Sequence, residues 1–333
     1  MSADPAPLEE PSAVSAGTPR LKKAGFWFTD FTFRGGRVKV HDTGADLTLD
    51  WTLISESLIW FGSHMIFRGR SWWLRLARRN PPKIWFTPDK PRPWYVVWMA
   101  MAWSGVRFAN TLEEADAAFY FLDQTYGEAI NPPLPRSFNF ACPDVSKTRV
   151  AEVFETVFGY PLAIDPTAWE GLAVEKGELN GVHDGRVINC PAIPQPGKVY
   201  QRLIDTSDES HAYDLRTHCV GGEPVLVWIK TKPRGDSFTI HNLGVVLRTP
   251  ASVFSAPELA MIRRFAAEFG SDWAGLDILR DRHDGRLYIV DVNKTDVGPI
   301  IALSLGDKLR SASILGAALN RLVCAPAAAH PRA

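Results

Sequence analysis

The feature that most restricts how this chain folds is a pair of apolar stretches around Asp284-Gly285. Residues 274–280 read AGLDILR and residues 286–293 read RLYIVDVN, and Asp-Gly is a typical hairpin turn. Side chains alternate between the two faces of a strand, so every second residue of RLYIVDVN shares one face. The residues predicted to share that face are Leu287, Ile289, Asp291 and Asn293. The sequence therefore predicts a hairpin that carries an acid and an amide together.

The length of the turn decides whether the first strand adds a third polar group. A three-residue loop, 283–285 with Gly285 left-handed, places Asp277 directly opposite Asp291, whereas a loop of two or four residues turns Asp277 to the other face. We expect the three-residue loop. Two close carboxylates repel each other unless a proton or cation lies between them, and all-oxygen ligands suit Mg²⁺. The alternative is a solvated hairpin, against which Leu287 and Ile289 on the same face argue.

The composition indicates a globular chain of the α+β or α/β class. It has 333 residues, 46% of them hydrophobic, which is enough for two or three packed layers. The net charge of zero excludes a chain-wide basic field, so we expect no nucleic-acid partner. Four scattered cysteines without a C-x-x-C pair are typical of reduced thiols, and we expect a cytoplasmic protein without a signal peptide. Residues 1–22 and 325–333 read as flexible tails.

Residues 23–140 predict an N-terminal α/β region. Alternation and Gly-Gly predict short strands in 25–50, and a helix follows at 51–79. Residues 83–123 then read strand, helix, strand, strand, which predicts a small and mostly parallel sheet. The Pro-rich stretch 131–136 reads as a linker.

Residues 57–79 contain an apolar run that is too short to span a membrane. Five arginines alternate with Trp72 and Trp73 in the stretch 68–79. We expect a helix that packs its tryptophans inward and holds its arginines in water. The alternative is a contact with a membrane surface or an anionic partner.

The second half predicts strands that pair over long distances, with three helices. A helix at 147–158 is capped by Asp144 or Ser146 and ends at Gly159. Strands are expected at 171–176, 185–190, 198–204, 213–220 and 224–232, and helices at 257–269 and 306–323.

The stretch GLDILRDRHDGRLYIVDVN resembles the metal-binding signature of the ATP-grasp superfamily, an Asp on one strand followed by acid-x-Asn on the next. The resemblance covers about 142–323 and implies two β-rich subdomains that hold ATP between them. The small subdomain is expected at 141–197 and the C-terminal subdomain at 198–324, behind a pre-ATP-grasp region at 23–140.

The resemblance also implies a set of site residues. One or two Mg²⁺ ions, with Mn²⁺ as the alternative, would be held by Asp277, Asp291 and Asn293. The phosphates would be bound by Lys147 and Lys176. The adenine would lie beside the strand that carries Tyr200, Gln201, Arg202 and Leu203, with Gln201 leading. The ribose would be reached by Asp205 or Asp208. Phosphate charge would be neutralised by Lys230, Lys232 or Arg234, of which Lys230 and Arg234 are the expected catalytic residues. Asn242 would lie near the active centre.

The resemblance implies a Mg-ATP-dependent ligase that activates a carboxylate for attack by an amine or thiol. Two departures from the family pattern matter here. The loop after Lys176 has only scattered glycines, and residue 291 is Asp where the ligases usually have Glu. An Asp-x-Asn version occurs in inositol phosphate kinases of this fold, so a small-molecule kinase is the alternative. A catalytically weak protein that binds nucleotide or a membrane surface is the third hypothesis. The acceptor, a small molecule or peptide, is not specified.

Overall fold

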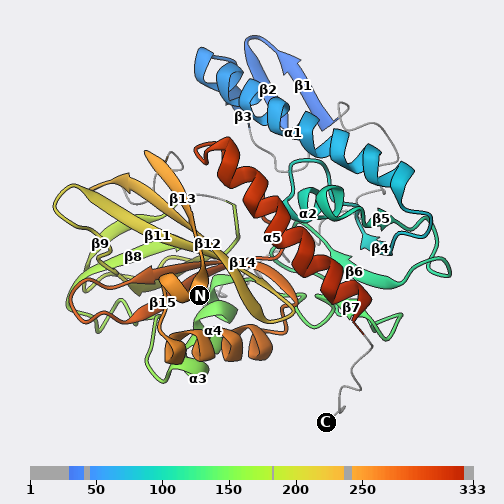
Figure 1. Cartoon of the computed structure of the whole chain (residues 1–333). Coiled ribbons are helices and arrows are strands. Elements are labelled where there is room, and N and C mark those ends of the chain that lie inside the picture. The colour runs from blue at the N-terminus through green and yellow to red at the C-terminus, as the bar shows by residue number, and fades with distance from the viewer. Residues whose placement is uncertain (1–29, 41–45, 182–183, 236–241, 326–333) are drawn as a thin grey trace, which may run out of the picture.

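Figure 1 shows the computed structural model, which describes residues 30–40, 46–181, 184–235 and 242–325. Within these residues the chain forms four sheets and five α-helices. The mixed α/β character predicted from the sequence is confirmed. The expected tail at 1–22 lies outside the described residues, and so does the tail expected at 325–333 apart from Ala325. None of the helices in the described ranges is long and apolar enough to cross a membrane.

The N-terminal part consists of a small antiparallel sheet and a long helix. The sheet contains β1 (Phe31–Arg34), β2 (Arg37–Val40) and β3 (Asp46–Thr48). Gly35 and Gly36 make the turn with φ of +58° and +71°, a conformation that costs glycine little. α1 (Trp51–Ala77) follows, and its N-cap Asp50 accepts a hydrogen bond from the Leu53 N–H at 2.8 Å.

The next sheet is parallel, as the β-α-β-β pattern predicts. Its order is β5-β4-β6-β7. The strands are β4 (Lys83–Pro88), β5 (Arg107–Phe108), β6 (Ala117–Phe121) and β7 (Ser137–Phe138), and α2 (Val96–Ser104) connects β4 to β5. Seven of the nine residues of α2 are buried, because α1 and α5 both pack against this helix. The short β7, which the sequence does not predict, follows the Pro-rich stretch.

A three-stranded antiparallel sheet and one helix form the next unit. The elements are α3 (Lys147–Phe158), β8 (Gly171–Gly177), β9 (Arg186–Cys190) and β10 (Lys198–Arg202). Of the two expected caps of α3, Ser146 is the one that accepts from the helix, through the Arg149 N–H. β10 pairs with β8 in this sheet, although the sequence grouped it with the C-terminal subdomain.

The largest sheet has five antiparallel strands in the order β13-β12-β11-β14-β15. The remaining elements are β11 (His211–Val220), β12 (Glu223–Pro233), β13 (Gly244–Arg248), η2 (Pro250–Ser252), α4 (Ala256–Phe269), β14 (Trp273–Arg280), β15 (Leu287–Asn293) and α5 (Leu305–Cys324). β13 is not predicted by the sequence.

Helices cover the five-stranded sheet on both faces (Figure 1). α3 and α4 pack on the face that carries Val227 and Leu215, and their apolar side chains form one core cluster. α5 and α2 pack on the other face beside Trp228, whose indole N–H donates to Ser311 at 2.9 Å. On this second face, residues beyond Trp228 in β11, β12, β14 and β15 are polar, and they form the site described next.

Candidate functional site

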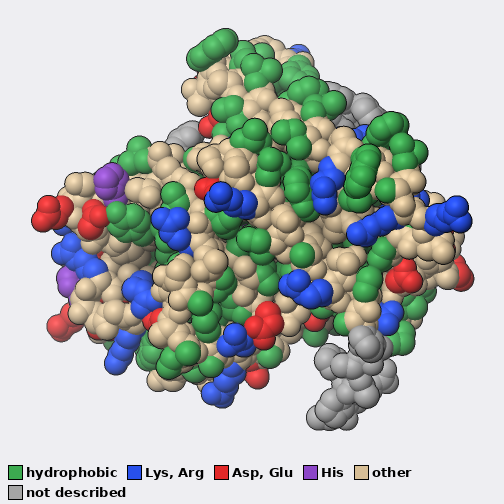
Figure 2. All heavy atoms as spheres, viewed as in Figure 1, with side chains coloured by type: hydrophobic (Ala, Val, Ile, Leu, Met, Phe, Trp, Pro, Cys, Tyr) green, Lys and Arg blue, Asp and Glu red, His purple; other side chains and the backbone are tan. Residues whose placement is uncertain are grey.

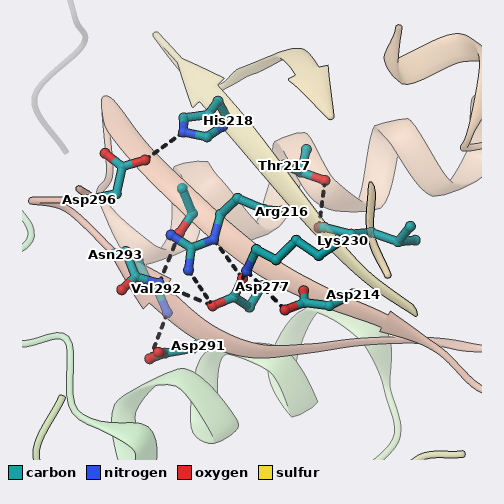
Figure 3. A network of polar contacts seen from close by, with 12 residues as sticks. Asp214, Arg216, Thr217, His218, Lys230, Asp277, Asp291, Val292, Asn293 and Asp296 are labelled. Carbon is teal, nitrogen blue, oxygen red and sulfur yellow. Dashed lines mark hydrogen bonds and ion pairs between the residues drawn. The ribbon is translucent and has the colours of Figure 1, made fainter. Parts of the chain in front are cut away.

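The centre of the site is a row of side chains that runs across the five-stranded sheet. The register places Trp228 opposite Arg216, Arg216 opposite Asp277, and Asp277 opposite Asp291. Residues directly opposite each other share a face, so this row lies on one surface of the sheet. Figure 3 shows the charged members pointing toward one another.

Asp277 is held by two cations. The Arg216 guanidinium donates from Nε to Oδ1 at 2.6 Å and from its terminal nitrogen to Oδ2 at 2.8 Å. The Lys230 amino group lies 3.0 Å from the same Oδ1 and 2.9 Å from Asp214 Oδ2 (Figure 3). Burial alone would raise the pKa of Asp277, but Arg216 and Lys230 outweigh this effect and hold the pKa well below its usual range. Asp277 is therefore ionised and fully paired.

The prediction that Asp277 faces Asp291 is confirmed, but the reason given for it is wrong. The loop has four residues, 282–285, closed by a hydrogen bond that the Asp281 N–H donates to the Arg286 carbonyl. Gly285 is left-handed, as expected, with φ of +72°. A four-residue loop would by itself misalign the two acids. A β-bulge at Val290 restores the alignment, because Ile278 pairs with Ile289 while Asp277 pairs with Asp291.

The bulge also corrects the predicted face of the strand. Ile289 pairs with Ile278, and Leu287 pairs with Arg280. Ile278 and Arg280 point to the face of β14 opposite to that of Asp277, so Ile289 and Leu287 lie on the face opposite the two acids. They contribute to the core beneath the hairpin. Their apolar character is therefore no evidence for or against a cation site, whereas Asp291 and Asn293 do share a face with Asp277.

Asp291 is a half-buried carboxylate without a cation in hydrogen-bond contact among the described residues. Its described hydrogen bond comes from the Val292 backbone N–H at 3.1 Å. Burial raises the pKa of Asp291, and the neighbouring Asp277 charge raises it further, while the charges of Lys176 and Lys147 act in the opposite direction. The position favours the approach of a positive charge.

Two lysines of the three-stranded unit influence this acid without contacting it. Lys176 of β8 donates to the carbonyl of Val290 at 3.1 Å, so the bulge residue is its partner. Lys147, the first residue of α3, donates to the Leu179 carbonyl at 2.8 Å and lies 3.3 Å from the Asn180 side-chain oxygen. Among the described residues, no carboxylate lies within salt-bridge distance of either amino group. Burial lowers the pKa of Lys147, and it lowers the pKa of Lys176 to about 8.

The strand predicted to border adenine lies next to these lysines. Val199 pairs with Lys176 and Gln201 with Val174, so the Gln201 side chain shares the face of Lys176. Gln201 is buried, and its Nε2 has no hydrogen-bond partner within the described structure. A buried amide without a partner is costly, which indicates that this position suits a ligand with an acceptor atom.

The neighbours of Gln201 are engaged elsewhere. The Tyr200 hydroxyl donates to Glu175 at 2.9 Å on the opposite face of β10, and the Arg202 guanidinium lies 5.7 Å from the Tyr288 ring. The Tyr200 carbonyl and the Arg202 N–H bond to residues 162–164. This edge of the strand is therefore already paired. Leu203, which follows β10, is partly exposed.

The remaining predicted residues lie toward the rim. Asp205 accepts from Ser207 and pairs with Arg282 at 3.0 Å. Asp208 is exposed and accepts from the Tyr213 hydroxyl. Arg234 is exposed and donates to the Glu209 carbonyl, so it does not join Lys230 at Asp277.

Two further predicted residues, Lys232 and Asn242, have partly buried side chains. Burial lowers the pKa of Lys232, which lies 4.0 Å from Asp214. Asn242 has a buried side-chain oxygen without a partner in the described part of the chain.

The sequence reasoning missed residues on β11. Asp214, Arg216 and His218 occupy alternate positions, so all three point to the site face. His218 Nε2 lies 2.5 Å from Asp296 Oδ2, and both side chains are 1% exposed. The signal that could have found them is the period of two in DLRTH, a charged or polar residue at every second position of a strand.

The donor set fits a divalent cation at Asp291 and Asn293. Asp291 supplies a half-buried carboxylate with no described cation in contact, and Asn293 lies on the same face, with its Nδ2 3.4 Å from Asp277 Oδ2. Asp277 as a third ligand stays a prediction, because a cation there competes with Arg216. No group of three or more His, Cys, Asp or Glu side chains with metal-binding geometry occurs in the part of the chain that the structure describes.

Among the comparisons with known proteins, only the search of solved structures gives matches. No protein-family model matches the sequence, and a search of curated proteins gives no match. Among solved structures, the chain is similar to the ATP-grasp ligase PsnB complexed with minimal precursor (12% identity, 71% of this chain and 99% of that chain, TM-score 0.45). It is also similar to an L-amino acid ligase from Bacillus licheniformis (12%, 74% and 76%, 0.43) and to a D-alanine–D-alanine ligase from Bacillus anthracis (10%, 73% and 96%, 0.43). At these identities and TM-scores the likeness assigns no role to any residue.

Proposed function

We propose that this chain is an enzyme of the ATP-grasp type, which binds Mg-ATP between its three-stranded and five-stranded sheets. The observation that carries the proposal is the position of Lys147 and Lys176. Lys147 is buried and Lys176 is largely so, both amino groups carry depressed pKa values, and both are held by neutral oxygens rather than by carboxylates. Buried positive charges of this kind are costly until an anion reaches them. The phosphates of ATP are an anion of the required charge and size.

The two sheets would contribute different groups to nucleotide binding. Lys147 and Lys176 approach Asp291 from one side, while Arg216 and Lys230 lie across the sheet on the other side of Asp277. Gln201 shares the face of Lys176 and has a free amide donor, so it is suited to an acceptor atom of the base. We assign Asp205 and Asp208 no closer role than the rim of the site.

A divalent cation would be held by Asp291 and Asn293. Oxygen ligands of this kind suit Mg²⁺. A Mg²⁺ ion bound there would neutralise part of the negative charge of the phosphates. Arg216 stays on Asp277 and keeps that carboxylate ionised and fixed. Lys230, shared between Asp214 and Asp277, is placed to stabilise negative charge that develops on the transferring phosphoryl group.

The proposed reaction is carboxylate activation. An oxygen of the substrate carboxylate attacks the γ-phosphorus of ATP, ADP leaves, and an amine or thiol then displaces phosphate from the acyl phosphate. The protein need supply no nucleophile for either step. This agrees with the site, whose described residues near Asp291 are cations, carboxylates and amides rather than an activated serine or cysteine.

The test compares Asp291→Ala with Glu268→Ala, an exposed acid on α4 that serves as the matched control. The full chain is incubated with Mg-ATP and a metabolite extract, and ADP, phosphate and new masses are followed together. We expect ADP formation by the native chain and the control, and a loss of at least about a hundredfold in Asp291→Ala, which removes charge stabilisation from the phosphates. An Asp291→Ala variant that turns over ATP at the native rate contradicts the proposal.

Asp277→Ala is the less informative variant. Removing it leaves Arg216 and Lys230 without their shared carboxylate, and breaking a buried ion pair costs about 3–5 kcal/mol. We therefore expect Asp277→Ala to unfold at lower urea concentration than Asp291→Ala, so a loss of its activity does not separate chemistry from folding.

A small-molecule kinase is the second candidate, and Asp at position 291 favours it. The products separate the two reactions. A ligase releases ADP and free phosphate in equal amounts, whereas a kinase releases ADP and leaves phosphate on a hydroxyl of the acceptor. ATP binding without ADP under any condition points instead to a nucleotide-binding protein without catalysis.

A further inference from the structure

α1 carries a second apolar face that nothing in the described structure covers. The first face packs on α2 through Phe67 and Leu74 and through the His64 ring, which stacks between the rings of Trp60 and Trp98 at 4.8 and 4.9 Å. The prediction that the tryptophans of the 68–79 stretch pack inward is wrong. Trp72 and Trp73 are 65% and 59% exposed, because Phe67 and Leu74 take the inward positions.

The uncovered face is a continuous row, which we name the α1 stripe. Its members are spaced three, four or seven residues apart and therefore lie along one side of the helix. They are Trp51, Leu58, Phe61, Met65, Trp72 and Leu76, each between 47% and 77% exposed. In Figure 2, hydrophobic side chains crowd the upper part of the molecule, where Figure 1 places α1. An exposed apolar row of this size usually marks a site that contacts another protein, a membrane or a ligand.

The charges around the stripe have one sign. Residues 51–79 contain five arginines and a single acid, Glu56, in a chain whose net charge is zero. Arg68 and Arg75 are seven residues apart and border the stripe on one side.

The contacts described for these arginines are not with acids. Arg70 and Arg78 donate to the backbone carbonyls of Trp103 and Ser104, and Arg68 lies 5.9 Å from the Trp98 ring. Within the described residues, no carboxylate pairs with any of the five guanidinium groups. The borders of the stripe are therefore open to an external anion.

We propose that the α1 stripe docks onto the surface of a lipid bilayer that contains anionic headgroups. A helix that lies in a membrane interface buries large apolar and tryptophan side chains and places arginines beside them at headgroup level. α1 has 27 residues and is about 40 Å long, yet it is not apolar enough to cross a membrane. It has the composition of a helix that lies flat on the surface.

A second copy of the chain is the less favoured occupant. Packing two α1 helices along their stripes would bring arginines from both copies to one seam, where α1 itself offers a single acid per copy, Glu56, to balance them. Like charges at such a seam oppose association. An anionic bilayer satisfies the apolar row and the arginine border together, and this inference does not depend on the ATP site.

The experiment measures flotation of the full chain with vesicles of phosphatidylcholine alone and of phosphatidylcholine with about 30% phosphatidylglycerol. We expect binding to the anionic vesicles that weakens as salt is raised. Arg68→Gln with Arg75→Gln should weaken that binding about tenfold or more, because each arginine near an anionic surface adds to the attraction. Trp72→Ser with Leu76→Ser should abolish it by removing the apolar insertion.

The matched controls are Ile193→Ser and Arg310→Gln, which change side chains that are also exposed but distant in sequence from α1. Both should bind vesicles like the native chain, and thermal unfolding should show all variants folded, since none of the changed side chains is buried. The proposal is overturned if the native chain does not float with anionic vesicles, or if the stripe variants float equally well. It is also overturned if light scattering finds a dimer that Trp72→Ser with Leu76→Ser converts to a monomer while no vesicle binding occurs.

Discussion

Asp277 and Asp291 face each other across two strands, yet their electrostatic states are opposite. Asp277 is clamped by Arg216 and Lys230, and its pKa is lowered. Asp291 has no cation in contact, and its pKa is raised by burial and by Asp277. Two residues with the same side chain thus play different parts, because Arg216 of β11 and Lys230 of β12 contact only Asp277. Asp291 is the carboxylate that remains free to bind a cation.

Lys176 provides a prediction at this scale. Burial lowers the pKa of its amino group to about 8, so near pH 8.5 much of it is neutral in the free protein. Bound phosphates would raise this pKa, and the lysine would then take up a proton. We expect ATP affinity to fall as the pH rises above about 8, and ATP binding near pH 8.5 to take up protons. Calorimetry in buffers of different ionisation enthalpy measures this uptake.

Lys176→Arg is the control for proton uptake, because a guanidinium stays charged at this pH. Proton uptake should drop in this variant while ATP still binds. Near pH 6.5 the native lysine is already charged, so its contribution to uptake should vanish there. Equal uptake by the native chain and Lys176→Arg at pH 8.5 would show that another group titrates on binding.

At the scale of elements, the β14–β15 hairpin shows how an irregularity positions a site. The loop is one residue longer than the register of the two acids requires, and the extra Val290 in β15 compensates for it. The same residue presents its carbonyl to Lys176. The bulge therefore aligns Asp277 with Asp291 and also links the hairpin to the three-stranded unit. A regular hairpin with a three-residue loop would achieve only the first.

α1 gives a prediction about stability. Gly62 and Gly69 lie inside this helix, and a Cβ added at either position meets no atom within 4 Å. Alanine is a better helix former than glycine and restricts the unfolded chain. We expect Gly62→Ala and Gly69→Ala each to raise the free energy of unfolding by about 0.5–1 kcal/mol, measured by urea denaturation.

Gly105→Ala is the contrasting variant. Gly105 ends α2 with φ of +78°, and its Cβ would lie 3.2 Å from Leu74 Cδ1. This substitution should lower the free energy of unfolding. A lower stability for Gly62→Ala than for the native chain would mean that the open side of α1 is less accessible than the structure indicates.

At the scale of the whole molecule, the segment after β15 connects the N-terminal α/β region to the five-stranded sheet. Thr295 donates to Asp123 at 2.6 Å, and the Tyr95 hydroxyl donates to the other oxygen of Asp123 at 2.6 Å. Val96 N–H bonds to the Asp296 carbonyl, and Lys294 donates to the Pro143 carbonyl at 2.9 Å. The residues that follow the proposed cation site therefore act as the joint between two parts of the fold.

Asp123→Ala tests this joint. The variant loses two short hydrogen bonds to a charged acceptor, and we expect the free energy of unfolding to fall by about 2 kcal/mol or more. Glu155→Ala, an exposed acid on α3, is the control and should change stability by less than about 0.5 kcal/mol. Urea denaturation of both variants decides the matter, and equal midpoints would mean that the joint contributes little.

The sequence by itself determined most elements and the polar face of the hairpin. The apolar period of three and four residues, with Ser146 and Gly159 at its ends, predicted α3 closely. Strand alternation placed Asp291 and Asn293 together. These features depend on hydrogen bonds, caps and turns between residues close in the chain, so they can be read without knowing the fold.

Only the tertiary structure decided how these parts are paired. Arg216 lies 61 positions before the acid it clamps, and Lys176 lies 114 positions before the carbonyl it reaches. The bulge at Val290 and the exposure of Trp72 likewise depend on contacts between segments that are far apart in the chain. Strand register and side-chain burial are decided by which strands and helices pack together in the whole molecule, and a single segment does not contain that information.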